Sequence, residues 1–250
     1  MSRTVDAVTA PSIPLTGAVN FRDLGGHPTP DGTVRTGRVF RSDSLAYLES
    51  EEAEWLVSEL GIGVVLDLRS EQEVEELPLT AVEAAGITIR RVPLLDGLHA
   101  SDETFEWQEL TLVGLYQLML DRCGDGFVEA TRLVADSAHH PMVFMCAAGK
   151  DRTGVLAALV LSTLGVDDDV IALDYARTAA VIDVIRSRLA GRETSREVPE
   201  KFLAVEAATM RELLDGLREE HGSVTSYLHA RGLEPEVVDA LRADLVTRSG

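Results

Sequence analysis

One feature constrains the fold of this chain more than any other: an apolar strand candidate is followed directly by a loop of small residues and then by an apolar helix. The strand candidate covers 142–146 (MVFMC), and the longest apolar stretch follows from Gly154 to Val166. That stretch carries Ser162 and Thr163 and is shorter than the roughly 20 residues that a membrane span needs. We therefore interpret it as a buried helix and expect no stable membrane insertion.

Further strand and helix candidates alternate along the first half of the chain. Val64–Leu68 (VVLDL) is continuous and rich in β-branched residues, as expected of a strand buried on both faces. Ile87–Leu94 is another strand candidate. Ser50 before an acidic turn, and the capping-box spacing of Ser70 and Glu73, predict the starts of helices.

The remaining helix signals lie in the second half. Apolar residues at helical spacing run from Thr111 to Ala138, with an interruption around 124–126. Asp167–Asp169 opens another helix, and we interpret these aspartates as caps rather than metal ligands because N-terminal backbone N–H groups favour them. The C-terminal third is predicted to be helical over Pro199–Arg218, Ser223–Ala230 and Pro235–Val246. These elements predict an α/β fold: a single domain with a mostly parallel central sheet flanked by helices, and a helical C-terminal region.

Charge and cysteine content narrow the function and the location. The net charge of −19 disfavours binding to nucleic acid or to an anionic membrane, since both need a broad positive field. A phosphate-bearing ligand would have to be held by a small local basic site. The chain has two cysteines, Cys123 and Cys146, which excludes a disulfide framework and favours a reducing compartment. No apolar signal segment follows Arg3, so we expect a cytoplasmic protein, with export by another route left open.

The turn after strand 142–146 carries residues suited to phosphate chemistry. Backbone N–H groups of such a turn, with the positive end of the following helix, form a nest for an anion. Cys146 at the start of the turn faces this nest, which favours its thiolate and makes it a candidate nucleophile. Arg152 can hold two phosphate oxygens in its fork. The loop residues between them are small and let the backbone approach an anion: Ala147, Ala148 and Gly149. The alternative is an inert buried thiol at a strand end.

The segment CAAGKDRTG (146–154) resembles the active-site loop of the cysteine-dependent phosphatases. Its Lys-Asp pair between glycine and arginine resembles, more narrowly, the bacterial tyrosine/serine protein phosphatase family with atypical dual-specificity or lipid activity. Other stretches fit the same family, namely NFRDLGG (20–26), RVFRSD (38–43), VVLDLRS (64–70) and TMR (209–211). The resemblance implies a cysteine-phosphatase-like domain over 15–250, preceded by a flexible arm over 1–14.

The resemblance also implies a role for each loop residue. Cys146 attacks phosphorus and forms a phosphocysteine, while Arg152 and the loop amides bind the phosphoryl oxygens. Thr153 donates a hydrogen bond to the departing sulfur. The general acid is either Asp67, which ends a predicted parallel strand, or Asp151 within the loop. The alternative for Asp67 is an ion pair with Arg69 or Arg41.

Lys150 adds a second positive charge that suits substrates with several phosphates, unless it simply faces solvent. The implied substrates are proteins carrying phosphotyrosine, phosphoserine or phosphothreonine, or phosphoinositides. The implied chemistry needs no cofactor, and no His, Cys and Asp spacing indicates a metal site. The oligomeric state is open.

The sequence departs from the family at Met145, where the family has a histidine that supports the loop. His139 and His140 precede the strand and are expected to face solvent, so they are poor substitutes. The departure keeps a rival function open, a phosphate-binding pseudophosphatase without turnover. A second rival is a sulfur-transfer or arsenate-reducing enzyme, which also uses a loop cysteine. The Arg152-Thr153 pair and the long helical C-terminal region argue against that second rival.

Overall fold

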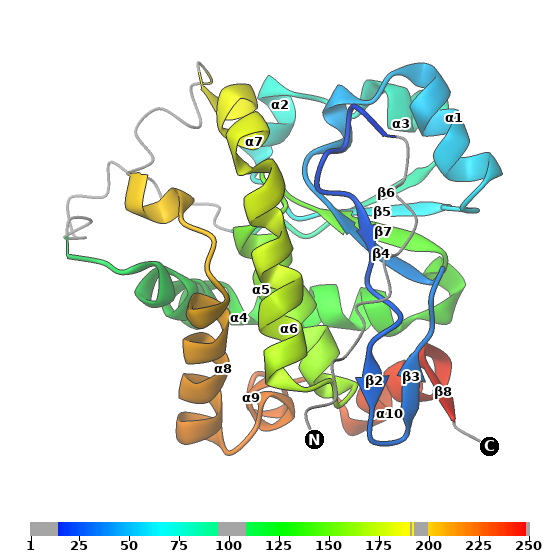
Figure 1. Ribbon diagram of the computed structural model, residues 1–250. Helices are drawn as coiled ribbons and strands as arrows, with labels where there is room; N and C mark the ends of the chain where they lie inside the picture. Colours follow the sequence, from blue (N-terminus) through cyan, green and yellow to red (C-terminus); the bar gives the residue numbers. More distant parts are fainter. Residues whose placement is uncertain (1–14, 95–108, 191, 193–199, 249–250) are drawn as a thin grey trace, which may run out of the picture.

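A computed structural model describes residues 15–94, 109–190, 192 and 200–248 (Figure 1). The arm predicted over 1–14 lies outside the described residues. The central sheet is five-stranded, and its strands follow the order β1 (Arg22–Asp23), β4 (Val39–Ser42), β7 (Met142–Met145), β5 (Val64–Asp67) and β6 (Thr88–Arg91). All of its pairings are parallel except that of the edge strand β1 with β4. The predicted mostly parallel α/β sheet is confirmed.

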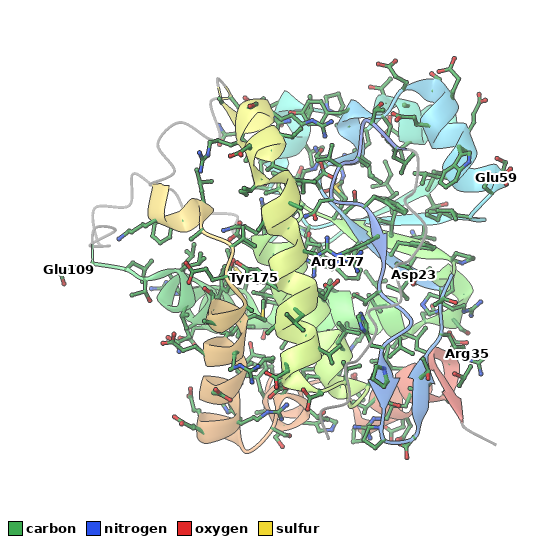
Figure 2. The ribbon with its side chains drawn as sticks, in the orientation of Figure 1. Asp23, Arg35, Glu59, Glu109, Tyr175 and Arg177 are labelled. Atoms are coloured by element: carbon green, nitrogen blue, oxygen red, sulfur yellow. The ribbon has the colours of Figure 1, made fainter. Side chains whose placement is uncertain are left out.

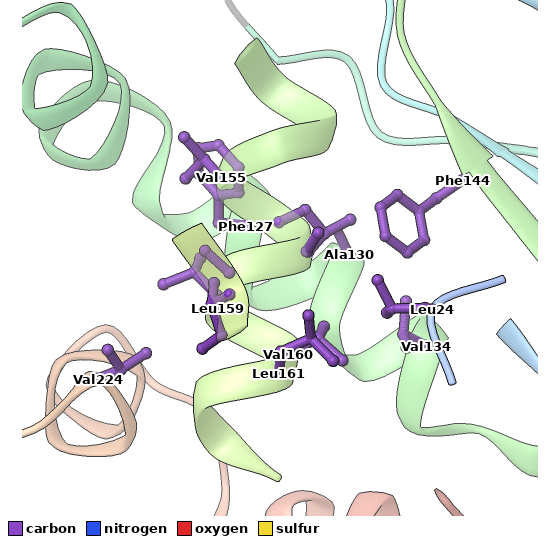
Figure 3. Packing of buried hydrophobic residues seen from close by; sticks show 14 of the residues in the cluster. Leu24, Phe127, Ala130, Val134, Phe144, Val155, Leu159, Val160, Leu161 and Val224 are labelled. Atoms are coloured by element: carbon purple, nitrogen blue, oxygen red, sulfur yellow. The ribbon is translucent and has the colours of Figure 1, made fainter. Parts of the chain in front are cut away.

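Helices cover both faces of this sheet, and the alternating side chains of β7 show why. Met142 and Phe144 belong to a buried cluster that includes residues of the helices α4 and α5, whereas Val143 and Met145 belong to a second cluster with α1 and α3. All residues of β7 are buried, as a strand covered on both faces requires. Figure 3 shows Phe144 packed toward α4 and α5.

The helices along the chain have the following bounds: α1 (Ser50–Ser58), α2 (Glu71–Glu76), α3 (Thr80–Ala84), α4 (Leu112–Ala135), α5 (Asp151–Thr163), α6 (Asp168–Ala176), α7 (Ile182–Leu189), α8 (Ala207–His221), α9 (Val224–Ala230) and α10 (Pro235–Leu245). Short 3-10 helices add η1 (Leu45–Tyr47), η2 (Ser137–His139), η3 (Arg177–Val181) and η5 (Glu200–Leu203). The predicted buried helix is α5, in which nearly every residue is buried. Among the described residues, no helix is both long enough and apolar enough to cross a membrane.

Helix starts agree with the predicted caps at two positions and differ at a third. The Ser70 hydroxyl accepts from the Glu73 backbone, and the Glu73 carboxylate accepts in return from the Ser70 backbone, so the predicted capping box of α2 is confirmed. Asp167 caps α6 as predicted. For α1, however, the N-cap is Glu49 rather than Ser50, because Glu52 three residues later completes a capping box with Glu49.

Several predicted boundaries are wrong. The helix predicted from Pro199 divides into η5 and α8, which begins only at Ala207. The interruption expected around 124–126 is a single non-helical residue, Cys123, inside α4. The last predicted helix ends at Leu245, because β8 (Val246–Arg248) pairs with β3 (Gly32–Val34). That pairing forms a small second sheet, which β2 (Pro28–Thr29) completes.

His140 is buried, contrary to the prediction that it faces solvent. Its side chain has no exposed surface, with Nδ1 2.7 Å from an Asp244 carboxylate oxygen and Nε2 2.8 Å from the Val134 carbonyl oxygen. The turn η2 directs the ring inward against α10, so tertiary packing decides its burial. His139 is also largely covered, with its Nδ1 3.0 Å from the Leu133 carbonyl oxygen.

Candidate active site

The parallel register brings the carboxyl ends of three strands to one edge of the sheet. Met145 at the end of β7 pairs with Ser42 of β4 on one side and with Asp67 of β5 on the other. Cys146 and its loop follow directly, so the loop leaves the centre of that edge, where ligand sites of open α/β sheets form. Leu68 N–H donates to the Met145 carbonyl at 2.9 Å and thereby extends the β5 contact to the base of the loop.

The loop carbonyls are held from outside by buried side chains. Asn20 Nδ2 donates to the carbonyls of Ala148 and Gly149 at 3.4 and 3.1 Å, and Arg41 donates to the Gly149 carbonyl at 3.0 Å. Ser44 N–H donates to the Ala147 carbonyl at 3.2 Å. Because the C=O and N–H of a trans peptide point in opposite directions, the next N–H groups are turned to the other side of the loop. These contacts therefore orient the amide nest.

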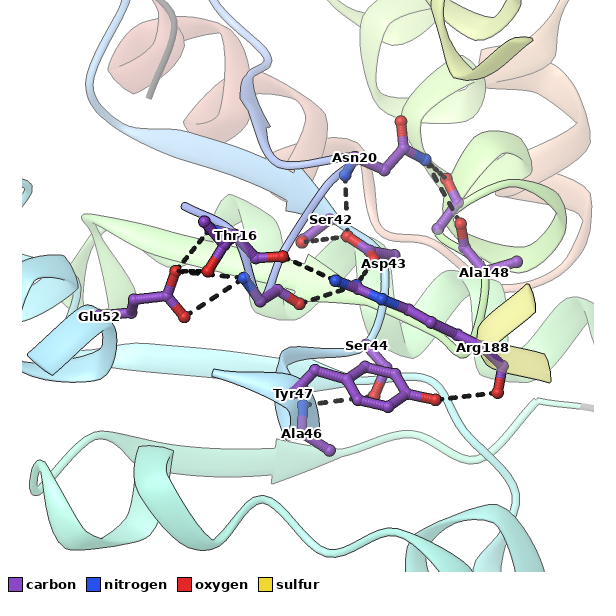
Figure 4. Close-up of polar contacts among 12 residues, drawn as sticks. Thr16, Asn20, Ser42, Asp43, Ser44, Ala46, Tyr47, Glu52, Ala148 and Arg188 are labelled. Carbon is purple, nitrogen blue, oxygen red and sulfur yellow. Dashed lines mark hydrogen bonds and ion pairs between the residues drawn. The ribbon is translucent and has the colours of Figure 1, made fainter. Parts of the chain in front are cut away.

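Asn20 is itself fixed by the segment that surrounds it (Figure 4). Its backbone N–H donates to Asp43 Oδ1 at 2.9 Å, and Arg188 of α7 donates to the other Asp43 oxygen at 3.0 Å. Arg188 also donates to the Thr16 and Gly17 carbonyls. Burial outweighs these hydrogen bonds and raises the pKa of Asp43. The segment around Asn20 thus supports the loop.

A buried cluster of two arginines and one aspartate anchors the same support. Asp174 of α6 lies 2.9 Å from Arg22 Nε and 2.7 Å from an Arg41 terminal nitrogen. Burial alone would raise the pKa of Asp174, but the two arginines lower it strongly. Burial lowers the pKa of Arg41 to about 10. The arginines stand in the family-like stretches 20–26 and 38–43, whereas no sequence signal marks Asp174.

Gly149 occupies a backbone position that only glycine fits. Its φ is +64°, and a Cβ there would lie 2.4 Å from the Ser42 carbonyl oxygen and 2.5 Å from the Asp43 nitrogen. The loop approaches β4 closely at this point because the contacts with Asn20 and Arg41 draw it there.

We expect Gly149→Ala to displace the loop from β4 and to lower both stability and turnover. Strain at a positive φ and a backbone clash together predict a loss of about 1–3 kcal/mol in the free energy of unfolding. Chemical denaturation, with a parallel assay of the activity that the resemblance implies, measures both effects. Gly86→Ala is the matched control, because Gly86 has a φ of +80° but open space around its Cβ position. Equal effects in the two variants would contradict the close-approach account.

Arg152 lies in the first turn of α5 with its guanidinium held by a carboxylate. Its two terminal nitrogens contact the Glu73 oxygens at 2.5 and 2.6 Å, and one also reaches the Leu68 carbonyl at 3.4 Å. Burial alone would raise the pKa of Glu73, but Arg152 lowers it to about 2. Burial alone would lower the pKa of Arg152, but the Glu73 carboxylate and then the negative charge of an ionised Cys146 raise it. The Glu73 contact was missed from the sequence, where this residue signalled only a helix cap.

The two acid candidates occupy different surroundings. Asp67 has no exposed surface, and Arg69 binds both of its oxygens, with Nε at 2.9 Å and a terminal nitrogen at 2.7 Å. The side chain of Asp151, at the start of α5, is 25% exposed and accepts a hydrogen bond from Tyr116 at 2.8 Å. Asp67 is therefore committed to an internal ion pair, whereas Asp151 lies beside Arg152 at the loop.

Lys150 is buried, and its ammonium group points away from solvent. Nζ donates to the Phe202 carbonyl at 2.5 Å and to the Ala204 carbonyl at 3.3 Å, and lies 2.9 Å from Asp151 Oδ1. It thereby ties the loop to η5. Its predicted role with a second phosphate stays a prediction, and it would require release of these carbonyls.

Cys146 and Thr153 are both buried. Cys146 is 1% exposed, and the positive charges of Arg152 and Arg41 both interact with it. Thr153 is fully buried, and its hydroxyl has no hydrogen-bond partner among the described residues. A buried hydroxyl without a partner costs free energy, so it is available to a group that arrives with the substrate.

Met145 serves packing instead of hydrogen bonding. It is fully buried in the apolar cluster that holds Phe40, Leu45 and Val65. The contacts of Asn20 and Arg41 orient the loop from the other side, so loop support in this chain does not depend on a polar side chain at position 145. Among the described residues, no group of three or more His, Cys, Asp or Glu side chains is placed to hold a metal ion.

The site combines a mostly parallel sheet, a buried cysteine directly after the central strand, a loop of oriented amides and an arginine in the next helix. This is the arrangement of the cysteine-dependent phosphatases. The sequence model of the tyrosine phosphatase family matches residues 13–247. Since that match spans nearly all of the chain, the protein belongs to the tyrosine phosphatase family and is a phosphatase.

Two relatives, the first two of the proteins that follow, agree with this assignment. The triple specificity protein phosphatase PtpB of Mycobacterium tuberculosis is 28% identical, and the match covers 93% of this chain and 98% of PtpB. A candidate tyrosine-protein phosphatase of Cupriavidus necator is 31% identical, with coverage of 92% and 84%. The solved catalytic core of Siw14 is 16% identical over 90% of this chain and 98% of its own, with a TM-score of 0.46. The family favours an enzyme over a pseudophosphatase and over the sulfur-transfer rival.

Proposed function

We propose that this protein hydrolyses phosphomonoesters through a phosphocysteine on Cys146, with Asp151 as the general acid. The observation that carries the proposal is the loop itself: its carbonyls are tied outward by Asn20 and Arg41, with Cys146 at one end and Arg152 at the other. Such an oriented nest of amides stabilises the oxygens of a phosphoryl group without reorganising during the reaction.

In the first step the Cys146 thiolate attacks phosphorus as the bond to the leaving oxygen breaks. The proton of the Asp151 carboxyl passes to that oxygen, while Arg152 and the loop amides bind the phosphoryl oxygens. In the second step water attacks phosphorus and gives a proton back to Asp151. The P–S bond breaks, and the Thr153 hydroxyl donates a hydrogen bond to the departing sulfur. Phosphate leaves and the thiolate is restored.

The choice of Asp151 over Asp67 rests on exposure and partners. A general acid must approach the leaving oxygen within hydrogen-bond distance. Asp67 is fully buried with both oxygens held by Arg69, while Asp151 is partly exposed next to Arg152. We assign Asp67 to holding Arg69, which in turn donates to the Leu77 carbonyl at 2.7 Å.

For the substrate we propose phosphotyrosine proteins first, with phosphoserine, phosphothreonine and phosphoinositides as further candidates. The name of the relative PtpB, a triple specificity phosphatase, supports this breadth. Phosphoinositides carrying adjacent phosphates would require Lys150 to leave the Phe202 carbonyl, which makes them the more demanding substrates.

Purified protein is expected to hydrolyse p-nitrophenyl phosphate, with inhibition by vanadate and no loss of rate in EDTA. Vanadate mimics the transferring phosphoryl group in the amide nest, and the proposed steps need no metal. A rate that disappears in EDTA, or no hydrolysis at any pH, would contradict the proposal.

Asp151→Asn is expected to slow poor leaving groups far more than good ones. General acid catalysis contributes about 10²–10⁴-fold, and an activated nitrophenolate leaves without it. The assay compares kcat/KM for phenyl phosphate and p-nitrophenyl phosphate. Asp67→Asn, which breaks the ion pair with Arg69, should lower both rates alike and reduce the melting temperature. A selective loss in Asp67→Asn instead would transfer the acid role to Asp67.

A further inference from the structure

Two buried tyrosines from different helices meet at Asp151. Tyr116 of α4 places its hydroxyl 2.8 Å from Asp151 Oδ1 and 2.7 Å from the hydroxyl of Tyr175 on α6. Both rings are essentially without exposed surface and meet edge to face, with their centroids 6.2 Å apart. Figure 2 shows Tyr175 directed inward from α6. Gly154 permits this approach, since a Cβ there would lie 3.0 Å from the Tyr175 ring.

The direction of these hydrogen bonds follows from the number of available protons. Each tyrosine has one hydroxyl hydrogen to donate, and a carboxylate oxygen can only accept. Tyr116 therefore donates to Asp151, and Tyr175 donates to Tyr116. Burial, followed by the charge of Asp151, raises the pKa of Tyr116 well above its ordinary value. Burial and the same charge also raise the pKa of Tyr175. Both phenols therefore stay protonated and act as donors at every working pH.

Both polar contacts of the Asp151 carboxylate fall on the same oxygen. Tyr116 donates to Oδ1, and Lys150 Nζ lies 2.9 Å from that same Oδ1. Among the described residues, Oδ2 has no hydrogen-bond partner. A proton on the carboxyl group is therefore carried by Oδ2, because Oδ1 already faces two donor groups.

We infer that Tyr116 is a positioning residue for the general acid: its hydroxyl fixes Asp151 through Oδ1 and leaves Oδ2 to deliver the proton, while Tyr175 holds Tyr116 in place. This role rests on the proposed function of Asp151. During the transfer the Oδ2 proton moves to the leaving oxygen as the P–O bond breaks, and Tyr116 keeps its own proton throughout. The contacts of Tyr116 restrict rotation of a carboxylate that is partly exposed to water, and such restriction is worth a large share of the rate.

The test measures kcat/KM of Tyr116→Phe on aryl phosphates of increasing leaving-group pKa. We expect a loss of about 10-fold or more on phenyl phosphate and of less than about 2-fold on p-nitrophenyl phosphate, because only the poor leaving group needs a positioned acid. Tyr175→Phe should give a smaller loss with the same selectivity. If Tyr116→Phe does not fold, Tyr175→Phe carries the test, because it removes the donor that holds Tyr116.

Tyr227→Phe is the matched control for removal of a buried tyrosine hydroxyl. Tyr227 donates to the Leu120 carbonyl of α4 at 2.8 Å and has no contact with Asp151. Its variant should leave the leaving-group dependence unchanged. In an Asp151→Asn background, Tyr116→Phe should cause no further selective loss, because there is no acid left to position.

The outcomes separate this inference from the function on which it rests. If Asp151→Asn is selective for poor leaving groups but Tyr116→Phe lowers both rates equally, or lowers neither, Tyr116 has no positioning role and the acid assignment stands. A selective loss from Tyr116→Phe that persists undiminished in the Asp151→Asn background overturns the inference as well. If Asp151→Asn itself shows no selectivity, both the acid assignment and the role of Tyr116 are wrong.

Discussion

Cys146→Ser is expected to abolish phosphatase turnover, with a fall of about 10⁴-fold or more, since a serine hydroxyl in the loop has no base positioned to activate it. Binding of an oxyanion should survive, because the amides oriented by Asn20 and Arg41 do not depend on the sulfur. Turnover of p-nitrophenyl phosphate and the affinity for phosphate, measured by calorimetry on the same preparation, give the two halves of the prediction.

Cys123→Ser is the matched control, because it removes the other thiol of the chain. Cys123 lies at the distortion of α4 and is only partly buried. We expect its variant to turn over substrate at close to the original rate. Retained turnover in Cys146→Ser would exclude a covalent mechanism through this cysteine.

Arg152→Lys is expected to lower kcat/KM by about 10²–10³-fold, comparable to removing a donor from an oxyanion site. A lysine keeps the charge but loses the planar fork that binds two oxygens at once. Glu73 contacts the two terminal nitrogens of Arg152. The Nε hydrogen and one hydrogen of a terminal nitrogen, which lie together on another edge of the guanidinium, remain for a phosphoryl group. A variant that keeps most of its activity would show that the charge alone suffices.

Glu73→Gln tests how the guanidinium is held. Because Glu73 fixes one edge of Arg152, we expect a loss of about 10-fold in kcat/KM as the arginine becomes less well placed. Improved substrate affinity would instead show that Glu73 blocks the phosphate position.

The pH dependence of this pair follows from the pKa of Glu73, which is lowered to about 2 in the folded protein. An acid whose pKa is lower in the folded than in the unfolded protein stabilises the fold above its unfolded pKa, which is about 4.5 for Glu73. That stabilisation is lost as the pH falls toward the pKa of the folded protein. The wild-type protein should therefore lose more stability than Glu73→Gln between about pH 4.5 and pH 2, as chemical denaturation at each pH would measure. Parallel losses in the two proteins would contradict the ion pair in solution.

The sequence predicted three of the five strands of the central sheet, β5, β6 and β7, whereas β1 and β4 were not predicted as strands. Val64–Leu66 and Met142–Met145 are continuous apolar runs, and a strand covered on both faces needs such composition. The boundaries of α8 and the pairing of β8 with β3 were missed, because the partners lie far apart in the chain and only tertiary contact decides them. The burial of His140 against Asp244 was missed for the same reason.

The loop over 146–152 was predictable because its candidate catalytic residues form one continuous segment. The residues that hold this loop in place were not predictable. Asn20 and Arg41 contact the loop, and Asp174 holds Arg41, so three distant parts of the chain meet there and their spacing in the sequence does not indicate it. The Glu73 contact was hidden because a helix-cap signal already accounted for the residue. The partners of Asp67 and Asp151 are the basis on which we propose Asp151 as the general acid, a choice that the sequence left open.

The most direct test of the central claim is detection of the phosphocysteine on Cys146. The wild-type protein is mixed with p-nitrophenyl phosphate, quenched in acid after a few milliseconds, and digested for peptide mass spectrometry. We predict one added phosphoryl group on the peptide that contains Cys146, and none on that peptide in the Cys146→Ser protein. A rapidly hydrolysing wild-type enzyme that shows no such adduct at any quench time, with no burst of nitrophenolate before steady state, would contradict the covalent mechanism.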